Sequence, residues 1–225
     1  MPSPHLLETR VPARPEGVVL VLHGGASREA SMAVSPTQLS VLRMVPVARR
    51  VARAGRGRLA VLRLLNTSRG WDTGHTPVDD VRWALAQLGE RDRLRDLPVG
   101  LVGHSLGGRA ALLAGAEPAV RSVVALNPWV YADDAVDLTG RRVLIAHGTD
   151  DRIASPRRAE TVARRLSRTA DSVGFLSVLG GKHAMLRRGG VFEQAAADFM
   201  TATLLGAGVH GPVEDLLDGS ETVSV

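Results

Sequence analysis

From Pro98 to Gly108 the chain reads Pro-Val-Gly-Leu-Val-Gly-His-Ser-Leu-Gly-Gly. The first half of this stretch is a short apolar run typical of a buried strand, and the residues that follow the stretch, Arg-Ala-Ala-Leu-Leu-Ala, are good helix formers. Between the two lies the pattern Gly103-x-Ser105-x-Gly107. It predicts a tight strand–turn–helix connection, because a turn that crowds the backbone needs glycine on both sides of the serine.

Such a connection is typical of a nucleophile elbow, in which the serine hydroxyl projects from the carboxyl end of a strand. The helix that begins after Ser105 directs the positive end of its dipole towards the same point. A serine in this position is a candidate nucleophile for acyl transfer.

Three stretches in a fixed order carry a resemblance to a known family. They are Leu22-His23-Gly24-Gly25, the elbow at residues 103–108, and then an acid and a histidine further along the chain. From about Val18 to Leu205 the chain resembles the α/β-hydrolase superfamily, in its branch of small serine esterases and acyl hydrolases. The resemblance implies a mostly parallel sheet with helices on both faces. It implies neither a metal nor an organic cofactor.

The resemblance also implies an oxyanion hole. In this family the residue after the His-Gly pair supplies one backbone N–H group, and here that residue is Gly25. The residue after the nucleophile supplies the other, and here it is Leu106. Each such N–H typically stabilises the transition state of acyl transfer by about 3 kcal/mol.

The acid of the family lies between the serine and the histidine in the sequence. The family spacing of glycine, two residues and aspartate selects Asp151 over its neighbour Asp150. Asp133 and Asp134 form an alternative, because some relatives carry the acid after the preceding strand. The acid holds the tautomer of the histidine and stabilises the imidazolium.

Only two histidines follow Asp151, and they are His183 and His210. His210 falls in the expected tail, whereas His183 follows the last expected strand, as the general base of the family does. We therefore predict that His183 is the general base. His104 is interpreted as a packing residue of the elbow, and His23 as a residue that satisfies loop hydrogen bonds.

The rest of the chain alternates between short apolar runs and helix-forming segments, which predicts a mostly parallel α/β sheet. Residues 1–17 are expected to form a loose arm or an edge strand, residues 18–205 the α/β-hydrolase domain, and residues 206–225 a disordered acidic tail. About 15 residues separate the strand that ends at Leu126 from the next one. This gap leaves no room for a cap domain, so we expect an open site.

Composition limits the partners. The chain has 225 residues and a formal charge of +5, with arginine as 27 of its 28 basic residues. The arginines are spread along the chain, and no basic–aromatic motif typical of nucleic-acid binding occurs. No apolar run has the length of a membrane span, and the absence of cysteine favours a cytoplasmic location.

Aromatic residues are rare, yet Trp71 and Trp129 both fall in loops that leave the carboxyl ends of expected strands. Ligands of parallel sheets bind at these ends, so we predict that both tryptophans border the substrate pocket. An open pocket favours short acyl chains.

The sequence therefore predicts a carboxylic-ester hydrolase with a small-molecule substrate. A thioesterase or peptidase of the same chemistry is an alternative. A non-catalytic binding protein on this fold is another, but such a protein has no need of the complete set of serine, acid and histidine.

Overall fold

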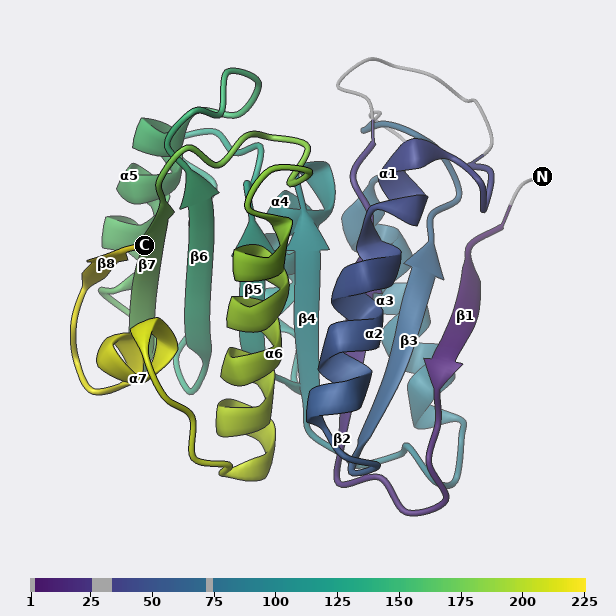
Figure 1. The fold of residues 1–225 in the computed structure, drawn as a ribbon. Helices are drawn as coiled ribbons and strands as arrows, with labels where there is room; N and C mark the ends of the chain where they lie inside the picture. The colour runs from purple at the N-terminus through teal and green to yellow at the C-terminus, as the bar shows by residue number, and fades with distance from the viewer. Residues whose placement is uncertain (1–2, 26–33, 72–74) are drawn as a thin grey trace.

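The computed structural model describes residues 3–25, 34–71 and 75–225. Within these residues eight strands form one sheet in the order β1-β3-β2-β4-β5-β6-β7-β8 (Figure 1). The strands are β1 (His5–Arg10), β2 (Gly17–Leu22), β3 (Leu59–Leu65), β4 (Val99–His104), β5 (Val120–Leu126), β6 (Arg142–Gly148), β7 (Ser172–Val178) and β8 (Thr222–Ser224).

All neighbouring strands are parallel except β1, which pairs antiparallel with β3 at one edge of the sheet. Because β2 to β7 are parallel, their carboxyl ends lie along the same side of the sheet. Side chains that follow these ends are thus brought close together, as predicted for an α/β fold.

Helices cover both faces of the sheet, and each face has its own apolar core. Figure 1 shows α2 and α6 in front of the sheet and α3 behind it. The front layer consists of α1 (Leu39–Leu42), α2 (Met44–Ala54), α6 (Gly189–Leu205) and α7 (Pro212–Leu217). The rear layer consists of α3 (Pro77–Gly89), α4 (Leu106–Leu113) with the short 3₁₀ turn η1 (Ala114–Ala116), and α5 (Pro156–Leu166). All six residues of β2 are buried, which explains its continuous apolar sequence.

The connection between β5 and β6 contains neither helix nor strand, so the sheet carries no cap domain at this point, as predicted. None of the helices in the described part of the chain is both long enough and apolar enough to cross a membrane.

The helical segment that leads into the front layer is interrupted between α1 and α2. Pro46 has no N–H to donate to the carbonyl of Leu42, and the helical pattern stops at Arg43 between α1 and α2. Pro46 then lies in the first turn of α2, where a missing N–H is tolerated. The interruption therefore lies three residues before the proline itself.

Both ends of the chain add edge strands. Residues 1–17 contain β1, which corresponds to the edge-strand alternative for this segment. Residues 206–225 differ from the expected disordered tail, because they form α7 and then β8 on the free edge of β7. Val213 and Leu216 of α7 are buried in the front core, and this burial outweighs the acidic composition of the segment.

This packing makes a prediction about stability. Leu216 is 4% exposed and packs against Gly174 of β7, whereas its neighbour Leu217 is only half-buried. Leu216→Ala should lower the free energy of unfolding by about 2–5 kcal/mol, because it opens a cavity in the core, and Leu217→Ala should lower it less. Urea unfolding of the two variants measures this difference. Equal unfolding midpoints for Leu216→Ala and the wild type would contradict the packed position of α7.

Candidate active site

The predicted elbow is present at the junction of β4 and α4. Ser105 adopts φ 55° and ψ −119°, a conformation that is strained for a residue with a side chain. A Cβ atom on Gly103 would lie 2.0 Å from the carbonyl oxygen of Gly107, and one on Gly107 would lie 2.5 Å from that of His23. Both glycines are therefore required by close backbone approach, as the sequence pattern predicts.

The structure brings together the three side chains that the sequence selects. Ser105 follows β4, Asp151 follows β6, and His183 follows β7. His183 Nε2 lies 3.0 Å from Ser105 Oγ, and His183 Nδ1 lies 2.8 Å from Asp151 Oδ2. The carboxylate accepts the Nδ1–H proton, which leaves Nε2 free to accept the proton of the serine hydroxyl.

Asp151 is held as a carboxylate. Its Oδ1 atom accepts the backbone N–H groups of Ile153 at 2.8 Å and Ala154 at 2.9 Å. Burial raises the pKa of Asp151, but hydrogen bonds from His147, His183 and these two N–H groups outweigh burial and hold it well below its usual range. The acid can therefore stabilise a protonated His183 at neutral pH.

The alternative acids lie in other surroundings. The side chain of Asp150 is exposed and lies near the Thr149 hydroxyl. Asp134 forms a bidentate ion pair with Arg109, with N–O distances of 2.6 and 2.8 Å. Of the four aspartates considered, the structure places only Asp151 at His183.

A network of buried polar groups fixes the loop that carries His183. His104 Nε2–H donates to the carbonyl of His183 at 2.8 Å. Asn127 Nδ2 donates to the carbonyls of Lys182 and His183 at 3.1 and 3.2 Å, while its Oδ1 accepts the N–H of Gly148 at 2.8 Å. Asn127 thereby ties the end of β6 to the loop after β7. Asn127 could not be singled out from the sequence, where its only signal is its position directly after a buried strand.

His23 fixes the loop that carries the predicted oxyanion-hole residue Gly25. The N–H of Asn66 donates to His23 Nε2 at 3.1 Å, so His23 Nδ1–H donates to the carbonyl of Gly24 at 2.6 Å. A Cβ atom on Gly25 would lie 2.0 Å from the carbonyl oxygen of Arg69, so this position also requires glycine. The residues that continue this loop, 26–33, lie outside the described part of the chain.

A pocket of about 390 Å³ opens over Ser105. Both predicted oxyanion-hole residues, Gly25 and Leu106, line it, and so does Trp129. The other residues that line it are Gly24, Ser40, Arg43, His104, Ile153 and His183. Among the described residues, no group of three or more histidine or carboxylate side chains is arranged to hold a metal ion.

The contacts of Trp71 differ from the predicted pocket role. Trp71 does not line this pocket, and the guanidinium of Arg109 stacks over its ring at 4.2 Å. The same guanidinium lies 4.8 Å from the ring of Tyr131, which in turn packs edge-on against Trp129. Trp71 thus belongs to a cation–π stack with Arg109 and Tyr131, which is linked to Trp129 through the ring of Tyr131.

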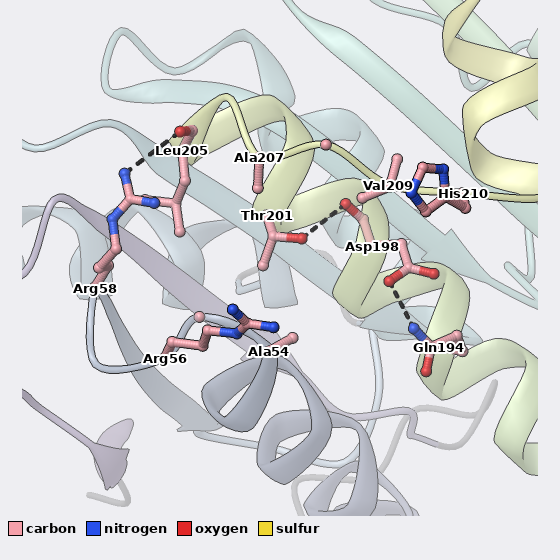
Figure 2. Close-up of a pocket in the computed structure, with 12 residues that line it drawn as sticks. Ala54, Arg56, Arg58, Gln194, Asp198, Thr201, Leu205, Ala207, Val209 and His210 are labelled. Carbon is pink, nitrogen blue, oxygen red and sulfur yellow. Dashed lines mark hydrogen bonds between the residues drawn. The ribbon is translucent and has the colours of Figure 1, made fainter.

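A second pocket, of about 610 Å³, lies at the opposite end of the sheet between the ends of α2 and α6 (Figure 2). Arg58 there donates to the carbonyl of Leu205, and the hydroxyl of Thr201 donates to the carbonyls of Ala197 and Asp198. These groups are engaged in structural hydrogen bonds, and no serine is among the described residues that line the pocket. Of these two pockets, only the one over Ser105 has both a serine and a histidine among its described lining residues.

Comparison with known proteins agrees with this architecture. The model of the alpha/beta hydrolase family matches residues 18–219. The chain belongs to this family. No curated protein gives a significant match to the sequence.

Solved structures of low sequence identity share the fold. Est1E from Butyrivibrio proteoclasticus, with ferulic acid bound, has a TM-score of 0.65 at 15% identity over 89% of this chain and 94% of its own. A lidless α/β serine hydrolase from Xanthomonas campestris has a TM-score of 0.63 at 16% identity over 91% and 90%. The esterase domain of a Rhodothermus marinus protein has a TM-score of 0.57 at 19% identity over 89% of each chain.

The burial of His104 and His23 leads us to expect that the free energy of unfolding depends on pH. Burial and the nearby His183 lower the pKa of His104 from 6.5 to about 3, so the folded protein keeps it neutral. The unfolded chain binds a proton at this residue below about pH 6.5, and stability is therefore lost as the pH falls from there towards 3. Burial lowers the pKa of His23 as well, which acts in the same direction.

Between pH 7 and pH 5 the wild type should lose on the order of 1–2 kcal/mol more unfolding free energy than His104→Gln. Denaturant unfolding at both pH values measures this, with exposed His5→Gln as the matched control that should follow the wild type. Parallel losses in all three proteins would show that His104 is not held neutral by the fold.

Proposed function

We propose that this protein is a serine hydrolase that cleaves carboxylic esters of small molecules through an acyl-enzyme on Ser105. One observation carries the proposal, namely the hydrogen-bonded series Ser105–His183–Asp151 at the tip of the elbow. It joins a nucleophile to a base and the base to an orienting acid, which is the arrangement that acyl transfer needs.

In the proposed reaction Ser105 Oγ attacks the acyl carbon while His183 Nε2 takes the hydroxyl proton. The N–H groups of Gly25 and Leu106 stabilise the negative oxygen, and the carboxylate of Asp151 stabilises the imidazolium. His183 then gives its proton to the departing alcohol, which leaves Ser105 acylated. Water attacks the acyl-enzyme with His183 as base, the acid is released, and the proton returns to Ser105.

Two further features support a short ester as the substrate. The absence of a cap between β5 and β6 leaves the pocket open, and its volume of about 390 Å³ suits a small ligand. Est1E, which shares the fold, is described with ferulic acid, a carboxylic acid and thus a molecule of the class that ester hydrolysis releases.

The direct test is covalent labelling by a fluorophosphonate. The wild type should be labelled once per chain, and Ser105→Ala should not be labelled, because the probe forms its bond with the activated serine. Hydrolysis of a short ester should fall on the order of a thousandfold or more in the same variant. Exposed Ser167→Ala serves as the matched control and should behave as wild type. Unchanged labelling of Ser105→Ala would overturn the proposal.

The adjacent aspartates provide a second test. Asp151→Asn should lower kcat by roughly 10⁴-fold with little change in KM, as the corresponding change does in chymotrypsin-type proteases, since the histidine loses its tautomer and its counter-charge. Asp150→Asn is the matched control and should stay close to wild type, because its side chain is exposed. Steady-state kinetics at neutral pH, with circular dichroism as a check of folding, distinguish the two. An impaired Asp150→Asn beside an active Asp151→Asn would contradict the assigned role.

A further inference from the structure

Arg43 occupies an unusual position for an arginine, because it lines the pocket over Ser105. It lies at the interruption between α1 and α2, which Pro46 imposes on the helix. The reaction proposed for Ser105, His183 and Asp151 does not require the side chain of Arg43.

The guanidinium of Arg43 is unpaired within the part of the chain that the structure describes. Among the residues that the structure describes it makes no hydrogen bond or ion pair, and its Nε atom is buried without a partner. Two other arginines form ion pairs with carboxylates, Arg58 with Glu16 and Arg109 with Asp134, whereas the Nε atom of Arg50 is, like that of Arg43, buried without a partner. Burial lowers the pKa of Arg43, so desolvation of the charge is uncompensated in the free protein.

Ser40 adds a second hydrogen-bond donor to the same wall of the pocket. Its Oγ atom accepts the side-chain N–H of Gln38 at 2.8 Å, which leaves its own O–H proton available to a ligand. Gln38 is itself fixed, because its Oε1 atom accepts from Arg69 Nε at 2.7 Å. Trp129 and Ile153 supply apolar surface to the pocket, and no aspartate or glutamate is among the described residues that line it.

A carboxylate is the ligand group that fits two such donors. The planar guanidinium presents parallel N–H groups that match two carboxylate oxygens, and charge-assisted hydrogen bonds of this kind are stronger than neutral ones. A neutral ester offers the charge of Arg43 no such partner.

We propose that Arg43, together with Ser40, binds a carboxylate carried by the substrate, so that the protein acts on acidic esters. The substrate class is a half-ester of a short dicarboxylic acid or an ester of a short hydroxy acid, according to whether the acyl or the alcohol part carries the charge. This inference rests on the proposed function, because it names the substrate class of the same site.

Two pairs of isosteric esters test the inference and distinguish the two sources of charge. Monomethyl succinate is compared with methyl 4-methylpentanoate, and O-acetylglycolate with isobutyl acetate, so that within each pair an isopropyl group replaces the carboxylate. The wild type should prefer the charged member of one pair by about 10- to 100-fold in kcat/KM, mainly through KM. The preferred pair identifies the part of the substrate that carries the charge.

Arg43→Met keeps the length of the side chain and should abolish this preference, while Arg43→Lys should retain part of it. Arg53→Met is the matched control, because it removes the same charge from an exposed position on α2, and it should keep the wild-type preference. A wild type without preference in either pair, or an unchanged preference in Arg43→Met, would overturn the inference.

A binding measurement separates this inference from the proposed reaction. In the Ser105→Ala background, calorimetric titration should show tighter binding of the charged ester than of its neutral isostere, and the added Arg43→Met change should remove the difference. If the charged ester binds more tightly but the wild type hydrolyses neither ester, the anion site is supported and the proposed reaction is contradicted. Hydrolysis of neutral esters without any binding preference would overturn the anion site and leave the reaction intact.

Discussion

The backbone of Ser105 is held at a positive φ angle, and the site depends on this constraint. The conformation costs on the order of 1–3 kcal/mol, and it persists because β4 and α4 are packed on both sides of it. Gly103 and Gly107 make the turn possible, since a side chain at either position would collide with backbone. The result is a serine oxygen that faces His183 while the following N–H group, that of Leu106, lies at the edge of the same pocket.

The rest of the site is placed by buried polar groups rather than by the sheet alone. Asn127 joins the loop of His183 to the end of β6, which leads into the loop of Asp151, and His104 donates a hydrogen bond to the carbonyl of His183. His23 performs the same task for the loop of Gly25. Because hydrogen bonds between buried groups are strong and directional, these contacts hold the three loops in one arrangement. These loops carry Gly25 and His183, which line the pocket, and no cap domain lies between β5 and β6.

The elbow could be predicted from the sequence because its requirements are local: a buried strand, glycines at fixed spacing and a helix. The order of serine, aspartate and histidine, with the family spacing, also placed Asp151 and His183 at the ends of the correct strands. The folded state of residues 206–225 could not be predicted from the sequence. It depends on the burial of Leu216 against residues of the core that are distant in the sequence. Trp71 and Arg109 are far apart in the sequence, so no local sequence pattern indicates their contact. The same holds for Arg43, whose place in the pocket follows from the packing of the α1–α2 interruption.

In the proposed reaction the elbow directs Ser105 towards His183 and towards the backbone N–H groups of Gly25 and Leu106 at once. A crystal structure of the fluorophosphonate adduct tests this arrangement, because the phosphoryl oxygen occupies the place of the oxyanion. We expect a covalent bond to Ser105 Oγ, with the phosphoryl oxygen about 2.7–3.1 Å from the nitrogen atoms of both Gly25 and Leu106. A phosphoryl oxygen that contacts neither nitrogen, or an adduct on another residue, would contradict the account.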